Sequence, residues 1–160
     1  MIFLTVGNWH KGFIRLIEAV DKLKERNLIA DEVIAQTGHT KYKLGHFEKS
    51  LDFCSAQDFS EYIKAAKVII SHAGIGTISH ALKLKKTIIV VPRKAALGEH
   101  FDDHQTATAR ALEAEHKVLV AYDTRELIQK IQDAESFTPA ETESHNQIVE
   151  AVKDFIQKFE

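Results

Sequence analysis

Two short segments of the sequence carry most of the residues that suit ligand binding. The first is SHAGIGT, residues 71–77, which stands between an apolar run and a helical pattern. Glycines at such a turn allow a ligand to approach the backbone closely, and the N-terminus of the following helix favours a phosphate. We therefore predict a diphosphate cradle here, formed by Gly74, Gly76 and the Thr77 hydroxyl. The alternative is a glycine pair that only eases a tight turn, since the pattern is neither a dinucleotide fingerprint nor a P-loop.

His72 ends the apolar run just before these glycines. Ser71 and His72 are neighbours, and adjacent strand residues point to opposite faces of a sheet, so they do not make a catalytic dyad. We expect His72 to orient a ligand or to have a structural role.

The second segment is PRKAALGEHFDDHQ, residues 92–105, which carries charges of both signs after an apolar run. An aspartate and a glutamine together suit the hydroxyls of a sugar, one as an acceptor and the other as both donor and acceptor. Asp103 and Gln105 are therefore predicted to face a sugar. Two alternatives stay open. The aspartates can complement the N-terminus of the next helix, or His100, Asp103 and His104 can ligate a metal ion.

A third segment, GNWHKG at residues 7–12, follows the first apolar run. Backbone amides of Gly7 and Asn8, with His10 or Lys11 beside them, can make a second phosphate contact. A helix-capping turn with Asn8 near the N-cap is an equally good explanation of the same residues.

Apolar runs alternate with helical patterns along the whole chain. The expected strands cover residues 1–6, 32–37, 51–55, 67–71, 87–92 and 117–122. The expected helices cover residues 13–26, 58–66 with Asp58 as N-cap, 75–84 and 101–115, then one after Asp123 and one at the C-terminus. This alternation predicts a Rossmann-like, doubly wound parallel α/β sheet of about six strands. In such sheets ligands bind beyond the carboxyl ends of the strands, where the three segments lie.

Length and composition limit the possibilities further. The chain has 160 residues, a net charge of −2 and a single cysteine, Cys54. We expect one Rossmann-like domain over residues 1–134, a polar connector over 135–146 and a helix over 147–160 that packs on the domain or on a partner. The near-neutral charge argues against nucleic-acid binding. Cys54 is expected to be a buried, reduced thiol. The absence of a signal peptide or membrane span predicts a cytoplasmic protein.

The segment SHAGIGTISHALKLKKTIIVVPR, followed by HFDDHQ, resembles the C-terminal, donor-binding half of GT-B glycosyltransferases of family 28. The likeness is greatest to small single-domain members, namely the donor-binding subunit of the eukaryotic lipid-linked N-acetylglucosaminyltransferase and the short subunit of bacterial exopolysaccharide and capsule transferases. The opening MIFLTVGN, followed by FIRLIEAVDKL, is similar to those subunits as well. The resemblance covers about residues 1–120.

This resemblance implies a UDP-sugar donor, with no cofactor and no bound metal. The implied diphosphate contacts are Gly7, Asn8, Gly74, Ile75, Gly76, Thr77 and Arg93. The implied sugar contacts are Asp103, His104 and Gln105, and we add His72, His80 and Glu99 as candidate sugar or nucleotide contacts. One departure from the family pattern is His80, which stands where a glutamate often holds the ribose. The general base is either one of the chain's own His10 and His100 or a residue of a partner.

The resemblance also implies an activity and a partner. We expect the donor-binding and catalytic subunit of an inverting hexosyltransferase in capsule or exopolysaccharide biosynthesis. A membrane-associated partner subunit would bring a polyprenyl-linked glycan acceptor to the inner face of the membrane. The alternatives are a non-catalytic nucleotide-sugar-binding subunit that activates a partner transferase, and a metal-dependent hydrolase built on His100, Asp103 and His104.

Overall fold

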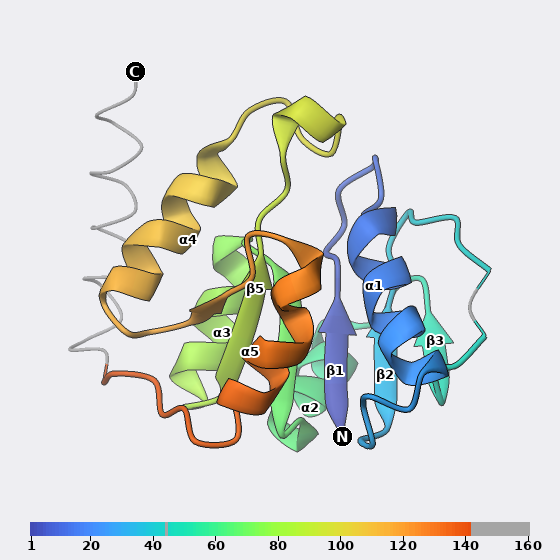
Figure 1. Cartoon of the computed structure of the whole chain (residues 1–160), viewed down its shortest axis with the longest axis horizontal. Helices are drawn as coiled ribbons and strands as arrows, with labels where there is room; N and C mark the ends of the chain where they lie inside the picture. Colours follow the sequence, from blue (N-terminus) through green and yellow to red (C-terminus); the bar gives the residue numbers. More distant parts are fainter. Residues whose placement is uncertain (44, 142–160) are drawn as a thin grey trace.

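A single parallel sheet lies at the centre of the molecule, with helices on both of its faces (Figure 1). The structure is a computed structural model that describes residues 1–43 and 45–141. Its strands are β1 (Ile2–Thr5), β2 (Val33–Gln36), β3 (Lys49–Leu51), β4 (Val68–His72), β5 (Thr87–Val91) and β6 (Leu119–Val120). They pair in parallel in the order β3-β2-β1-β4-β5-β6. The predicted six-stranded, Rossmann-like fold is confirmed.

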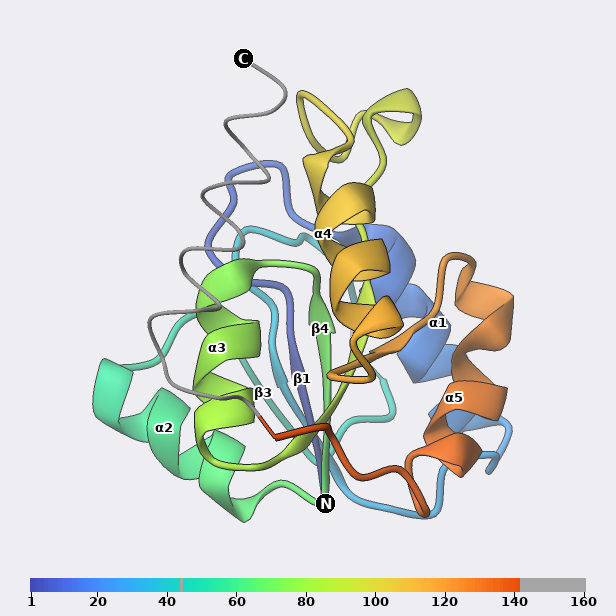
Figure 2. The same cartoon turned by 90° about the vertical axis from the view of Figure 1, so that its left-hand side faces the viewer.

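The central strands are apolar on both faces because both faces are covered. Ile2, Phe3 and Leu4 of β1 are almost completely buried, as are the middle residues of β4 and β5. Helices α1 (Ile14–Glu25) and α5 (Leu127–Asp133) pack on one face. Helices α2 (Ala56–Ala65), α3 (Ile75–Lys83) and α4 (His104–Ala114) pack on the other. Figure 2 shows the two helix layers on opposite sides of the sheet. Among the described helices none has the length and apolarity to cross a membrane.

The strand order reverses between β1 and β4, which lie side by side in the middle of the sheet. Thr5 of β1 pairs with Ser71 of β4, so these two strands end at the same level. The chain then leaves β1 toward α1 and leaves β4 toward α3, on opposite faces. The diverging connections open a crevice at this point, where Rossmann-like folds bind their ligands.

The region between β2 and α2 differs from the sequence-based prediction. The third strand was expected over residues 51–55, but β3 is Lys49–Leu51 and only its last residue falls in that range. The chain turns away from the sheet after β3 because Ser55 caps α2, accepting a hydrogen bond from the Asp58 amide at 3.0 Å. The predicted N-cap, Asp58, instead lies in the first turn of this helix. Cys54 lies in the turn and is partly exposed, contrary to the buried thiol that we expected.

Other boundaries shift as well. β6 covers only Leu119–Val120 of the strand expected over residues 117–122. α4 begins at His104 rather than near residue 101, because the preceding residues form an irregular loop after the short 3₁₀ helix η1 (Ala95–Leu97). A second 3₁₀ helix, η2 (Thr124–Glu126), precedes α5, and its N-cap is Asp123. The predicted helix over 147–160 and the end of the predicted connector lie outside the described residues.

Candidate functional site

A pocket of about 450 Å³ opens at the crevice between the ends of β1 and β4. Residues from the β1–α1 loop, the β4–α3 turn, the end of β2 and α2 surround it. Its lining residues are Gly7, Asn8, Gln36, Cys54, Ser55, Ala56, Phe59, His72, Gly74, Gly76, Thr77 and His80. Seven of these residues were among the candidates from the sequence. The β2 and α2 contributions were not predicted.

The imidazole of His72 lies between the two glycine segments of the pocket. A Cβ atom on Gly74 would stand 2.1 Å from Nε2 of His72, and one on Gly7 would stand 2.6 Å from Cε1. Both distances are shorter than any real contact, so neither position accepts a side chain while the ring stays where it is. Gly7 also has a φ of +70°, which favours glycine. Gly74 has an ordinary φ of −87°, so only the imidazole requires a glycine there.

His72 is neutral at pH 7. Its pKa is lowered to about 4, mainly by burial and then by the positive charge of Arg93 and the neighbouring His100, while a backbone hydrogen bond with Thr5 acts in the opposite direction. Its Nδ1 lies 3.3 Å from Ser71 Oγ. A neutral ring in this position provides hydrogen bonding to a ligand without adding charge to the pocket.

The N-terminus of α3 faces the same pocket. Gly74 is its N-cap, and the first turn, all of which is described, carries no side-chain cap and no acidic residue. The first amides of a helix have no partner inside the helix, so they are available to an anion. Ile75 packs its side chain against the core and offers only its amide. A Cβ on Gly76 would meet no described atom within 4 Å, so this position borders open space.

One wall of the pocket is formed by side chains of α2 and α3. His80 Nε2 lies 3.2 Å from Ser60 Oγ, and the ring of Phe59 lies 6.1 Å from the imidazole. At the end of β2, Oε1 of Gln36 accepts a hydrogen bond from Thr5 Oγ1 at 2.5 Å. Its Nε2 donates to the Asp52 carbonyl at 2.8 Å. This wall therefore has a fixed shape, and His80 stays the predicted contact to the nucleotide.

Arg93 lies in the core and not in the pocket. One guanidinium nitrogen donates to the Val6 carbonyl at 2.9 Å, and the other donates to the carbonyls of Gly12 and Glu99. The guanidinium carbon lies 4.5 Å above the ring of Phe13. Burial lowers the pKa of Arg93 to about 10, so the side chain stays charged at pH 7. The structure gives Arg93 a structural role, as a cross-link between two loops, in place of the predicted diphosphate contact.

The predicted sugar-facing residues of the β5–α4 loop are also engaged within the fold. Glu99 accepts two hydrogen bonds from Arg15, at 2.7 and 2.9 Å. Gln105 is buried, and its amide oxygen accepts from the backbone of Arg93 at 3.1 Å. Asp103 Oδ1 accepts from the Ala95 amide at 2.9 Å. All three lie outside the pocket lined by the described residues.

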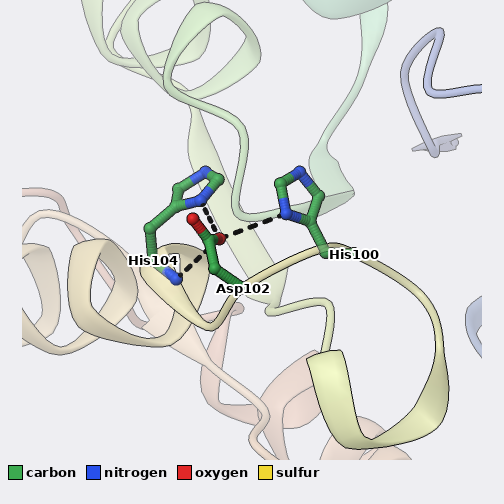
Figure 3. A group of neighbouring side chains, drawn as sticks. All are labelled: His100, Asp102 and His104. Carbon is green, nitrogen blue, oxygen red and sulfur yellow. Dashed lines mark hydrogen bonds and ion pairs between the residues drawn. The ribbon is translucent and has the colours of Figure 1, made fainter.

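The two candidate bases, His10 and His100, both pack against Trp9 in an aromatic cluster outside the pocket lining. The ring of Trp9 stacks on His100 with 4.7 Å between ring centroids, and the exposed His10 lies 4.6 Å from the same Trp9 ring. Burial and the neighbouring His104 lower the pKa of His100. Figure 3 shows His100 and His104 on either side of Asp102, with both Nδ1 atoms directed to one carboxylate oxygen. Asp102, and not the Asp103 of the metal hypothesis, lies beside the two imidazoles, because Asp103 Oδ1 accepts from the Ala95 amide at the start of η1.

Comparisons with known proteins agree with this architecture. Residues 1–159 match the model of the family described as glycosyltransferase family 28 C-terminal domain. No curated protein matches the chain.

Among solved structures, the chain is similar to ALG13, with a TM-score of 0.64 and 18% identity, and each chain covers 94% of the other. The glycotransferase of kitacinnamycin aligns with a TM-score of 0.63 and 15% identity over 84% of this chain and 34% of its own length. MurG from Acinetobacter baumannii aligns with a TM-score of 0.57 and 18% identity over 84% of this chain and 40% of its own. At these identities the similarity shows the fold alone, and this chain spans only about a third of the kitacinnamycin enzyme.

Proposed function

Because this chain belongs to the glycosyltransferase family 28 C-terminal domain family, we propose that it is the donor-binding and catalytic subunit of a UDP-sugar-dependent glycosyltransferase. The pocket between β1 and β4 carries this proposal. It joins an uncapped helix N-terminus, two glycine segments and a neutral imidazole in a volume of about 450 Å³, which suits a small nucleotide.

The proposed mechanism begins with the donor diphosphate at the N-terminus of α3. The amides of Ile75, Gly76 and Thr77 would bind its oxygens, and the helix dipole would stabilise the charge that grows on the leaving diphosphate. The fixed charge of buried Arg93 adds a positive field from behind the loops without contacting the donor. His80, on the α2 side, would contact the nucleotide.

The second half of the reaction needs an acceptor and a general base. We propose that a membrane-associated partner subunit carries a polyprenyl-linked glycan to the same edge of the sheet, where an inverting attack transfers a hexose in capsule or exopolysaccharide synthesis. The resemblance to short two-subunit transferases supports this arrangement. The base is His10, His100 or a residue of the partner, and the effects on activity of His10→Gln and His100→Gln in the reconstituted enzyme would distinguish these sources.

Calorimetric titration with a panel of UDP-hexoses tests donor binding. Thr77→Ala removes a hydroxyl beside the helix N-terminus and is expected to weaken the affinity about fivefold, the equivalent of roughly one hydrogen bond. Thr108→Ala is the matched control, because Thr108 is equally buried but lies in α4 outside the pocket. The control should bind as the wild type does. If UDP-hexoses fail to bind with or without the partner, or if both variants behave alike, the proposal is wrong.

One observation favours a second candidate, a non-catalytic subunit that binds a nucleotide sugar and activates its partner. Glu99, Asp103 and Gln105 hold the β5–α4 loop together, so the described pocket has contacts for a diphosphate but lacks these predicted sugar contacts. Reconstitution with the partner decides between the two candidates. A catalytic subunit loses activity with Thr77→Ala in parallel with donor affinity, whereas an accessory subunit keeps its activity.

A further inference from the structure

Three potential metal ligands lie close together where the β5–α4 loop enters α4, outside the pocket lining. His100, Asp102 and His104 each offer one ligand atom, and these atoms all lie within 4.8 Å of one another (Figure 3). His100 Nδ1 lies 3.2 Å from Asp102 Oδ1, and His104 Nδ1 is hydrogen-bonded to the same oxygen. None of the three lines the pocket described above. The group therefore lies outside the proposed diphosphate pocket, and a metal on Nδ1 of His100 would leave His10 or a residue of the partner as the general base.

The ligand set is typical of one class of ion. Two imidazole nitrogens and one carboxylate oxygen suit Zn²⁺ and the neighbouring divalent transition metals, whereas Mg²⁺ and Ca²⁺ prefer oxygen ligands alone. In the structure without metal, both Nδ1 atoms are directed to the Asp102 carboxylate, so any proton on Nδ1 lies between the ring and that carboxylate. When a metal binds, that proton moves to Nε2 and Nδ1 becomes a ligand.

The three side chains are already held in place. His100 is buried and stacks on Trp9 at an interplanar angle of 24°. Asp102 also accepts from the backbone amide of His104 at 3.2 Å, which fixes its carboxylate at the start of α4. The side chains of Asp102 and His104 are 44% and 45% exposed, so the open side of the group faces solvent. Water can complete the coordination from that side.

We propose that His100, Asp102 and His104 bind one divalent transition-metal ion of the zinc class through two imidazole nitrogens and one carboxylate oxygen. The ion ties the loop after β5 to the first turn of α4. The bonds formed are from the metal to both Nδ1 atoms and to the carboxylate, and the waters that they displace return to solvent. This site extends the function of the chain beyond donor binding.

The test uses the full chain without an affinity tag, stripped with EDTA and then freed of chelator. Calorimetric titration with ZnCl₂ should give one saturable site per chain, and MgCl₂ should give none. His104→Gln and Asp102→Asn are expected to weaken Zn²⁺ binding at least roughly tenfold. Since the chain has nine histidines, His39→Gln is the matched control, because His39 is exposed and lies outside the group. Thr77→Ala should also keep wild-type Zn²⁺ affinity.

A second measurement separates coordination from loss of folding. Saturating Zn²⁺ should raise the unfolding temperature of the wild type by a few degrees and leave that of His104→Gln unchanged, because only a ligand that binds the folded state stabilises it. Co²⁺ should give a visible absorption band with the wild type that His104→Gln lacks. The proposal is overturned if Zn²⁺ shows no saturable binding, if His104→Gln binds it as the wild type does, or if His39→Gln loses as much affinity.

Discussion

Two regions of the molecule contain groups that suit ligands: the pocket between β1 and β4, and the loop between β5 and α4. They differ in whether these groups already form hydrogen bonds within the fold. At the pocket, the helix N-terminus of α3 has no side-chain cap and Gly76 borders open space. In the loop, Glu99 and Gln105 find hydrogen-bond partners within the fold. The described pocket therefore leaves the N-terminus of α3 without a side-chain cap, whereas the loop uses its polar side chains for bonds within the fold.

This difference follows from the position of each region in the sheet. The pocket forms where neighbouring strands send their connections to opposite faces, so backbone amides end at a gap. The β5–α4 loop instead returns over the β1–α1 loop, where Arg93 reaches the carbonyls of Val6 and Gly12. A charged residue there serves to join two loops, and its replacement should affect stability before it affects binding.

The largest effect is expected for Arg93→Met. Three backbone carbonyls would lose their donor and the core would lose a close contact with Phe13, so the free energy of unfolding should fall by roughly 3–5 kcal/mol. Urea-induced unfolding followed by circular dichroism measures this change.

Arg125→Ala is the control for this substitution. Its side chain is 89% exposed and pairs with Asp123, and removing it should leave the urea midpoint of unfolding almost unchanged. If Arg93→Met unfolds at the wild-type urea concentration but no longer binds UDP-sugar, Arg93 belongs to the pocket and the contrast between the two regions fails.

A pH series addresses the pocket through His72. Its folded pKa is about 4, against 6.5 for an unperturbed histidine, so between these values the unfolded chain binds a proton that the folded chain does not. Stability should therefore be complete above pH 6.5 and decline as the pH falls toward 4, by at most roughly 3 kcal/mol from this residue.

His72→Gln removes this contribution. Urea unfolding at several pH values should show a shallower loss of stability in the variant, with a remaining slope from groups such as His100, whose pKa is also lowered. Parallel slopes for the two proteins would mean that the imidazole is not buried between the glycine segments.

A smaller effect is expected for Gly74→Ala. The new methyl would overlap the imidazole of His72, and the free energy of unfolding should fall by roughly 1–3 kcal/mol. The φ of Gly74 is ordinary, so the cost should come from this overlap alone. In a His72→Ala background the same substitution should cost much less, which a double-mutant cycle measures as a coupling energy.

Gly76→Ala is the matched comparison. It lies in the same helix next to open space, and alanine there should raise stability by up to about 1 kcal/mol because the helix backbone loses less entropy. The explanation is wrong if alanine lowers the free energy of unfolding equally at Gly74 and Gly76. It is also wrong if His72→Ala does not reduce the loss at Gly74, because the imidazole would then not be what requires a glycine there.

The sequence predicted the parts of the structure that depend on local patterns and on one topological rule. Continuous apolar runs predicted the strands, and the rule for carboxyl ends brought Gly7, His72 and Thr77 together, as the pocket lining shows. Whether these residues contact a donor stays a prediction. The β3 boundary was wrong because Cys54 looked like part of an apolar strand, whereas the cap at Ser55 decides where the chain leaves the sheet.

The remaining errors concern long-range partners. The sequence around Arg93 does not show that carbonyls of the β1–α1 loop lie within reach, and so its charge looked available to a ligand. Gln36 and Phe59 were missed for a similar reason, since their place in the pocket depends on how β2 and α2 pack. Asp102 and Asp103 are neighbours with the same side chain, and only the turn of the loop decides which one faces the histidines.

The pairing of β1 with β4 also sets the order in which the protein can become functional. Ile2 pairs with Val68, and β2, β3 and two helices lie between them in the chain. During synthesis the first three strands leave the ribosome well before β4, so the two glycine segments meet only after a slow, long-range closure. A nascent chain that ends before Val68 therefore has no pocket, and the ability to bind a donor should appear late and in a single step.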